Sequence, residues 1–150
     1  MYGIGSGRTG GVAIARVPRD SVEDKSAYEY MTGFDAGGSP VYEAGPAAER
    51  DPFIIVQKPA GELSVMYDGY VGEWLMTYLR GGDLIMRASK TMEGPFSKPR
   101  LIAAQSDYPG LYGAFMSPVY TEDGGRIIYF MTSIFDPIYN VAIVRAELVK

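Results

Sequence analysis

The feature that most constrains the fold is a strand–turn–strand pattern in the middle of the chain. Gly61–Tyr67 (GELSVMY) and Glu73–Leu79 (EWLMTYL) are rich in apolar and aromatic residues, and an Asp-Gly pair beginning at Asp68 lies between them. Asp-Gly between two such runs is a strong signal for a β-hairpin. Two further runs follow after turns, Asp83–Ala88 (DLIMRA) and Arg100–Ala103 (RLIA). Four antiparallel strands in about 50 residues is the size of one β-propeller blade.

The same pattern recurs on both sides of this unit. Toward the C-terminus, Gly110–Tyr120, Arg126–Thr132 and Asn140–Leu148 match its first three strands. Toward the N-terminus, Gly11–Val17 and Ala27–Thr32 resemble the outer half of a preceding blade. The sequence therefore predicts an all-β fold made of antiparallel, four-stranded β-propeller blades.

The spacing of the repeats predicts about two to three blades in a single partial β-propeller domain over residues 1–150. The approximate blades are 1–50, which is partial, 51–105 and 106–150. The segments GVAIARV, DLIMRAS and NVAIVRA each carry an Arg after a short apolar run, which supports the repeat. A closed propeller usually has at least four blades. We therefore expect either that further blades complete the ring or that copies of the chain associate.

Composition excludes several classes of site. The 150 residues contain no Cys and no His, which excludes disulfides, cysteine or histidine metal sites and the Ser-His-Asp triad. The net charge is −4 and no basic stripe is present, so nucleic acid is not an expected partner. No apolar run approaches the roughly 18–20 residues that cross a bilayer, and the first residues lack the apolar segment of a signal peptide. We expect no metal and no cofactor, and any acid–base chemistry must use carboxylates, Tyr or Lys.

An ordered set of short motifs runs along nearly the whole chain. It comprises Ser6–Val12, Ala15–Pro18, Tyr28–Tyr30 with Thr32-Gly33, Gly61–Val65, Trp74–Tyr78, Gly94–Ser97 and Tyr139–Val141. In this order the motifs resemble the C-terminal half of the arabinanase-like five-bladed β-propellers, a family long catalogued as a domain of unknown function with endo-D-arabinanase members. The resemblance implies a carbohydrate-active, glycoside hydrolase-like protein that acts on or binds furanose polysaccharide, and an extracellular location. Family members carry their candidate catalytic aspartate in an earlier acidic region, which has no counterpart in this sequence.

Two acidic residues are candidates for catalysis, because glycoside hydrolysis needs two carboxyl groups flanking the bond. Glu62 is the candidate general acid, because it opens the innermost strand of its blade, where related sugar-cutting propellers place a proton donor. The alternative is that Glu62 pairs with a neighbouring Arg or caps a turn. Asp68 is the candidate second carboxylate, and the alternative is that it serves its own Asp-Gly turn.

Five residues are candidates for contacts with substrate. Arg8 lies in a glycine-rich loop that could bring the backbone close to a sugar, although a plain tight turn also explains the loop. Tyr67, Tyr108 and Tyr112 could stack on sugar rings, because aromatic faces suit the apolar faces of sugars. Tyr112 and Met116 belong to the start of an inner strand, where a cleft would open, and Tyr108 directly precedes it.

Three functions remain open on the sequence alone. The first is a glycoside hydrolase or part of one, with Glu62 as acid and the partner carboxylate outside this chain or in another copy. The second is a non-catalytic glycan-binding or structural module. The third is a self-assembling half-propeller whose copies close a ring, because exposed sheet edges and faces favour association. The expected partners are therefore a polysaccharide or oligosaccharide, and either further blades or other copies of the chain.

Overall fold

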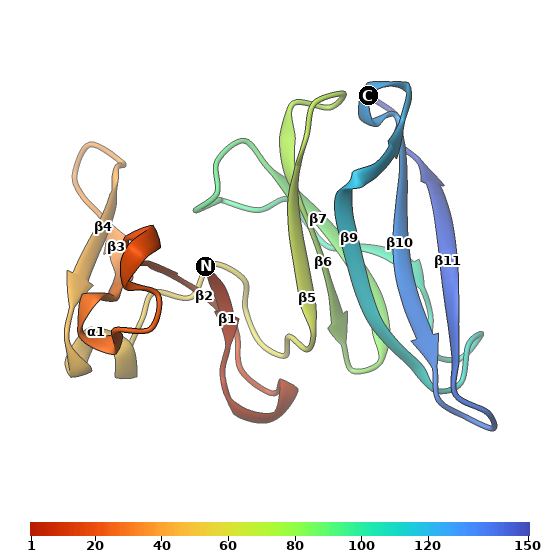
Figure 1. Cartoon of the computed structure of the whole chain (residues 1–150), viewed down its shortest axis with the longest axis horizontal. Helices are drawn as coiled ribbons and strands as arrows, with labels where there is room; N and C mark the ends of the chain where they lie inside the picture. Colours follow the sequence, from red (N-terminus) through yellow and green to blue (C-terminus); the bar gives the residue numbers. More distant parts are fainter.

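The polypeptide forms three antiparallel β-sheets that stand in a row (Figure 1). A computed structural model describes residues 1–150, except for the side chain of Ser6. Two sheets have four strands and one has three. This arrangement confirms the predicted all-β fold with a partial set of blade-like units. It differs from the prediction in the first sheet, which is more complete than expected, whereas the third sheet has the three strands that the sequence indicates.

The first sheet has the strand order β1-β2-β3-β4. Its β1 strand is not predicted by the sequence, because three residues with a central glycine are too short to show an alternation. The sheet is therefore four-stranded rather than the outer half of a blade. A five-residue helix, α1, follows β4 and packs against β3 and β4. The elements are β1 (Tyr2–Ile4), β2 (Val12–Arg16), β3 (Glu29–Phe34), β4 (Pro40–Ala44) and α1 (Pro46–Arg50).

The second sheet follows the hairpin pattern closely and has the order β5-β6-β7-β8. Five consecutive residues of β6, from Leu75 to Leu79, are buried. This burial on both faces arises because the first sheet covers one side of β6 and the third sheet covers the other. The strands are β5 (Leu63–Asp68), β6 (Glu73–Arg80), β7 (Asp83–Ser89) and β8 (Arg100–Ala103).

The third sheet has the order β11-β10-β9 and contains a bulge in β9. The pairing shifts between Met131 and Ser133 of β10, opposite Gly113, whose φ of 72° is readily adopted only by glycine. As a result, Leu111 and Ala114 both face the second sheet although they are three residues apart. The strands are β9 (Leu111–Glu122), β10 (Ile127–Ile134) and β11 (Asn140–Glu147).

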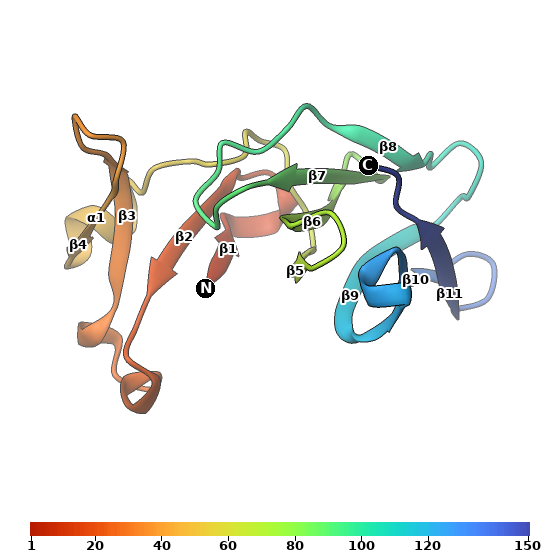
Figure 2. The same cartoon turned by 90° about the horizontal axis from the view of Figure 1, so that it is seen from above.

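Two apolar cores join the three sheets. One core lies between the first and second sheets and is built around Val12, Tyr78 and Ile85, and the other lies between the second and third sheets. Polar contacts reinforce the second interface: Thr77 Oγ1 donates to Ala114 O at 2.7 Å. Seen from above, the sheets stand beside one another with β5 near β9 (Figure 2). None of the helices in the described chain is long and apolar enough to cross a membrane.

Candidate functional site

Three of the predicted site residues meet where the three sheets approach one another. Arg8 ends the short 3₁₀ turn between β1 and β2, Glu62 directly precedes β5, and Tyr112 is the second residue of β9. Each residue thus comes from a different sheet or from the segment leading into it. We call this group the Arg8–Glu62–Tyr112 cluster.

The local fold of the β1–β2 loop presents Arg8 to the cluster. The neck of the loop is narrow: a Cβ atom on Gly10 would lie 2.6 Å from Gly5 N, so a larger residue does not fit there. Arg8 itself has a φ of 64°, in the left-handed region that residues other than glycine rarely adopt. Such backbone strain costs of the order of 1–3 kcal/mol and tends to occur at functional sites. The strained backbone is therefore a second indication, besides its side-chain contacts, that Arg8 belongs to a functional site.

The guanidinium of Arg8 links the other two members of the cluster. Its Nη2 lies 2.6 Å from Glu62 Oε1, and its Cζ lies 5.0 Å from the centroid of the Tyr112 ring. Both separations suit attractive contacts, an ion pair in the first case and a cation–π contact in the second. The structure therefore contains the ion pair between Glu62 and an arginine that the sequence allows as an alternative role of Glu62. The Arg8 side chain is 57% exposed, which leaves it free to rearrange when a ligand arrives.

Glu62 is the most enclosed polar group of the cluster. Its side chain is only 20% exposed. Oε1 faces Arg8, whereas Oε2 is buried and has no hydrogen-bond partner among the described residues. A buried polar atom without a partner is uncommon in folded proteins and calls for an explanation. A hydroxyl group of a ligand would satisfy it, and the same oxygen is the one available for proton transfer.

Asp68 lies at the opposite end of β5 and is not part of this cluster. Six residue steps of extended chain lead from Glu62 to Asp68, which corresponds to about 20 Å. Its Oδ1 accepts hydrogen bonds from Tyr70 N and Val71 N, both at 3.0 Å, and its side chain is fully buried. This is the turn-forming role that the sequence also allows. The structure does not bring Glu62 and Asp68 together as a catalytic pair, which requires a separation of roughly 5–10 Å.

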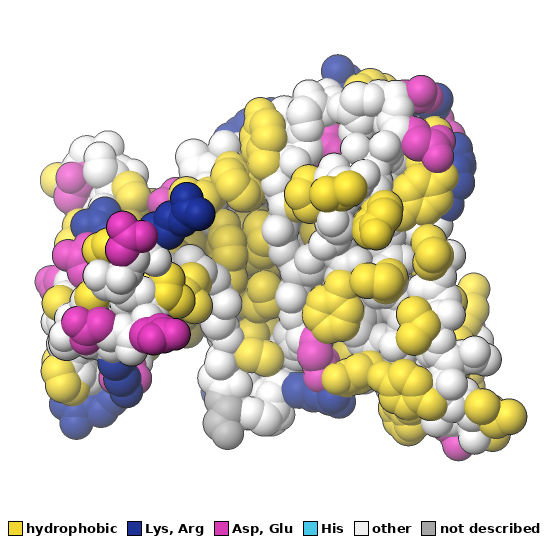
Figure 3. Space-filling view, viewed as in Figure 1, with side chains coloured by type: hydrophobic (Ala, Val, Ile, Leu, Met, Phe, Trp, Pro, Cys, Tyr) yellow, Lys and Arg dark blue, Asp and Glu magenta, His cyan; other side chains and the backbone are white. Residues whose placement is uncertain are grey.

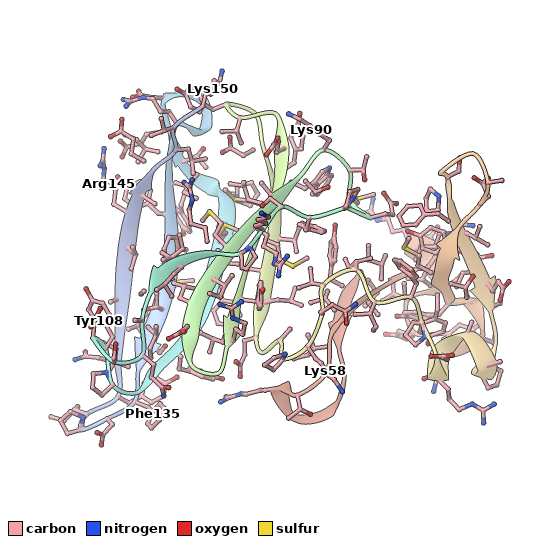
Figure 4. The ribbon with its side chains drawn as sticks, turned by 180° about the vertical axis from the view of Figure 1, so that it is seen from behind. Lys58, Lys90, Tyr108, Phe135, Arg145 and Lys150 are labelled. Atoms are coloured by element: carbon pink, nitrogen blue, oxygen red, sulfur yellow. The ribbon has the colours of Figure 1, made fainter. Side chains whose placement is uncertain are left out.

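The remaining predicted contacts are divided between surface and core. Met116 is 9% exposed and packs in the core between the second and third sheets, and its role in substrate binding stays a prediction. Tyr67 is exposed, but it neighbours Asp68 and packs edge-on against Trp74, away from Glu62. Tyr108 is exposed and lies at the lower end of the third sheet, where β9 begins (Figure 4). The substrate-binding roles of all three residues stay predictions, and none of the three belongs to the Arg8–Glu62–Tyr112 cluster.

One aromatic residue near this end was not singled out by the sequence. Phe135 begins the β10–β11 connection, is 55% exposed, and donates its N–H to Gly110 O at 3.0 Å. Figure 4 shows Phe135 at the same end of the third sheet as Tyr108, with Lys150 at the opposite end. Its sequence signal is weak, because an aromatic residue before an Asp-Pro turn is common. It adds apolar surface near the start of β9.

The described side chains do not form an evident metal site. Among them, no group of three or more Asp or Glu residues is arranged to hold one. The chemistry available at the Arg8–Glu62–Tyr112 cluster is therefore that of one carboxyl group, one guanidinium and one phenol. These groups can bind hydroxyls, and the carboxyl group can give or accept a proton.

Comparison with known proteins identifies a family and a similar solved structure. The family described as "Domain of unknown function (DUF4185)" matches residues 1–145. No curated protein matches the sequence significantly. Among solved structures, the chain is similar to a crystal structure from Bacteroides ovatus ATCC 8483 that is named a "putative hydrolase", with a TM-score of 0.61 and 17% identity. The similarity covers 90% of this chain and 39% of that one, so the chain spans well under half of that relative.

Proposed function

The chain belongs to the DUF4185 family, and we propose that it is a carbohydrate-active, glycoside hydrolase-like module that acts on or binds furanose polysaccharide. The observation that carries the proposal is the Arg8–Glu62–Tyr112 cluster, which combines a carboxyl group, a cation and an aromatic ring. The structural relative named as a hydrolase supports a hydrolytic function. The resemblance of the ordered motifs to arabinanase-like propellers supports a furanose substrate.

Each member of the cluster has a role in this proposal. Tyr112 stacks on a sugar ring, since aromatic faces suit the apolar faces of sugars. Arg8 donates hydrogen bonds to sugar hydroxyls. Glu62 donates the proton to the leaving oxygen as general acid. Because a general acid must be protonated, Arg8 has to release Glu62 Oε1 when substrate binds, and its exposed side chain has room to do so.

The second carboxyl group of the reaction lies outside the cluster in this proposal. Asp68 is about 20 Å from Glu62 along β5, which is too far for the roughly 5–10 Å that the two carboxyl groups span. We therefore assign the partner carboxylate to further sheets or to another copy of the chain. The coverage of only 39% of the structural relative is consistent with a larger functional unit. Within that unit, each of the three sheets would act as one blade of a single domain.

The direct test is the release of reducing ends from arabinan by the wild-type chain and by Glu62→Gln. We expect release that the substitution abolishes, because glutamine cannot donate the proton. Glu49→Gln is the matched control, since Glu49 is also paired to a cation, Lys25 Nζ at 2.8 Å, but lies in α1, outside the cluster. Release that survives Glu62→Gln would refute the role assigned to Glu62.

A second candidate function is glycan binding without hydrolysis, which the single carboxyl group of the cluster favours. Titration of the chain with arabinan oligosaccharides distinguishes the two functions. Binding that Tyr112→Ala weakens, without release of reducing ends, would identify a binding module. Tyr120→Ala is the control, because Tyr120 is an exposed tyrosine on the third sheet beyond the cluster.

A further inference from the structure

We propose that Ser64 and Thr77 are positioning residues, whose hydroxyl groups hold β9 in the one register that brings Tyr112 into the Arg8–Glu62–Tyr112 cluster. The inference rests on the proposed function where it concerns sugar binding, whereas the position of the Tyr112 ring is a property of the chain alone. It uses only the interface between the second and third sheets, both sides of which the structure describes.

The two hydroxyl groups lie side by side in the second sheet. Ser64 of β5 and Thr77 of β6 are directly opposite each other in the ladder between these strands. Both belong to the side of the sheet that faces the third sheet, as do Met66 and Leu75 of the same two strands. Thr77 is completely buried and Ser64 is partly buried. Two polar side chains are thus placed together in an interface that is largely apolar.

Both hydroxyl groups bond to the backbone of β9. Thr77 Oγ1 donates to Ala114 O at 2.7 Å. Ser64 Oγ accepts from Met116 N at 3.0 Å and donates to Met116 O at 3.3 Å. Because β9 is the edge strand of the third sheet, part of its backbone has no neighbouring strand to bond to. The pair therefore bonds alternate residues of one edge strand, and Figure 3 shows the second and third sheets as one continuous body.

These hydrogen bonds supply register, which apolar packing alone does not fix. The hydrophobic effect is non-directional, and a slip of a strand by two residues leaves the same alternate side chains facing the same way. A slip of this kind would move Tyr112 by about 7 Å along the strand. The contact of 5.0 Å between its ring centroid and Arg8 Cζ would then be lost.

The sequence of β9 offers the required contacts at one register only. A slip in one direction would bring Pro118 to Ser64, and proline has no N–H for the hydroxyl group to accept. A slip in the other direction would bring the Ser64 and Thr77 contacts onto both sides of Gly113, where the bulge interrupts the two-residue period of the strand. The two hydroxyl groups therefore select the observed position of β9.

The hydrogen bond of Thr77 lies next to the residue that it positions. Only Gly113 separates Ala114 from Tyr112, and the pairing of β9 with β10 shifts at this glycine. Because the ladder is interrupted there, β10 alone does not fix the direction of the Tyr112 side chain. Thr77 anchors the strand immediately after the bulge.

The other two members of the cluster are held independently of β9. The segment that leads into β5 bonds directly to the β1–β2 loop, because Ala60 N donates to Gly10 O at 2.8 Å. Arg8 and Glu62 therefore keep their relative position when β9 moves. Loss of the hydroxyl groups should displace Tyr112 and leave the ion pair in place.

The first experiment follows the Arg8 side chain by NMR in the free protein. The ring of Tyr112 shifts the resonances of the Arg8 Nε and Cδ protons, and Tyr112→Leu defines the size of this ring-current effect. We expect Thr77→Val, which keeps the shape of the side chain, to remove most of the effect, and Thr77→Ser to retain it. Ser89→Ala is the matched control, since Ser89 at the end of β7 is also buried and accepts from Thr91 N at 3.2 Å.

Ser64→Ala provides a second variant, which keeps the test decisive if Thr77→Val does not fold. We expect it also to reduce the ring-current effect on Arg8, because the hydrogen bonds to Met116 are lost. Circular dichroism checks that each variant is folded. Arg8 resonances that stay at their wild-type positions in the folded variants would overturn the proposal, because the hydroxyl groups would then only join the two sheets.

The second experiment measures affinity for arabinan oligosaccharides by isothermal titration. We expect Thr77→Val to weaken binding by about threefold to tenfold in the wild-type background and to have no further effect in Tyr112→Leu, because residues that act through one another are not additive. Equal weakening in both backgrounds would overturn the positioning role. A wild-type chain that binds no arabinan would contradict the proposed function alone, and the Arg8 resonances then decide whether the hydroxyl groups position Tyr112.

Discussion

The two ends of β5 carry one carboxyl group each, in opposite surroundings. Asp68 is fully buried and accepts two backbone N–H groups of its own turn. Glu62 is partly exposed, is paired with a cation from a distant loop, and keeps a buried oxygen without a partner among the described residues. Asp68 Oδ2 is also buried without a partner among the described residues, so the two carboxyl groups differ in the contacts of their other oxygen. Asp68 Oδ1 accepts only from the backbone of its own turn, which is typical of a structural residue. Glu62 Oε1 instead pairs with the exposed guanidinium of Arg8, which belongs to another sheet and can move when a ligand binds.

Because Asp68 is the structural carboxyl group of the two, we expect its substitution to have the largest effect on the free energy of unfolding. Replacement by alanine leaves Tyr70 N and Val71 N without their acceptor, and hydrogen bonds to a buried carboxylate contribute about 1.5–3 kcal/mol each. We expect Asp68→Ala to lower the free energy of unfolding by about 3 kcal/mol, as measured by urea denaturation. Asp20→Ala, at an exposed position, should change it by less than about 0.5 kcal/mol. Equal effects would contradict the structural role of Asp68.

A smaller loss of stability is expected from a substitution at Gly125, in the turn that packs on Asp68. A Cβ atom on Gly125 would lie 2.6 Å from Asp68 Oδ2, and Gly125 has a φ of 104°. We expect Gly125→Ala to cost about 2 kcal/mol of stability in the same urea assay, because both the backbone and the contact are strained. Gly69→Ala is the control, since its Cβ would find an ordinary contact of 3.8 Å with Gly124 O. A Gly125→Ala protein that is as stable as the wild type would show that the turn at Gly125 and the turn at Asp68 do not constrain each other.

High pH should loosen the packing that holds the first sheet, and with it Arg8, in place. Tyr42 OH donates to Glu93 Oε1 at 3.1 Å, and burial together with the charge of Glu93 raises the pKa of Tyr42 to about 12 from the usual 10.0. Burial and the same charge also raise the pKa of Tyr2, whose OH donates to Met92 O at 2.9 Å. The folded state therefore holds these protons more tightly than the unfolded state.

The stability contributed by neutral Tyr42 is fully present below pH 10 and is lost as the pH rises through about 12. We expect Tm to fall by a few degrees more over this interval in the wild type than in Tyr42→Phe, which has no phenol to ionise. Thermal unfolding followed by circular dichroism from pH 8 upward measures the difference. An identical decline in both proteins would mean that Tyr42 does not link the two sheets in solution.

The smallest effect on stability is expected at the Glu62 end. Arg8 is more than half exposed, and surface ion pairs contribute between 0 and about 1 kcal/mol. Arg8→Ala should lower the free energy of unfolding by about 1 kcal/mol or less, because alanine carries the same backbone strain and the substitution removes only an exposed ion pair and an exposed cation–π contact. Its affinity for arabinan oligosaccharides should nevertheless fall, as isothermal titration would detect. A large loss of stability would assign Arg8 a structural role instead.

Much of the fold follows from local sequence patterns, whereas the site depends on contacts that such patterns do not encode. The Asp-Gly hairpin places β5 and β6 correctly, and Arg100–Ala103 is β8 as predicted. The burial of Met116 depends on the bulge at Gly113, which shifts the pairing of β9 with β10 between Tyr112 and Phe115 and which the local sequence pattern does not specify. The ion pair between Arg8 and Glu62 joins residues 54 positions apart. It is set by how two sheets pack, which no local pattern specifies.

The most direct test of the account compares Glu62→Gln with Asp68→Asn in one arabinan assay, with Tm measured for each protein. We expect Glu62→Gln to abolish the release of reducing ends while its Tm stays close to that of the wild type. We expect Asp68→Asn to lower Tm but to leave the release per folded molecule unchanged. A Glu62→Gln protein that still cleaves arabinan, or an Asp68→Asn protein that is fully stable but inactive, would contradict the division of roles along β5.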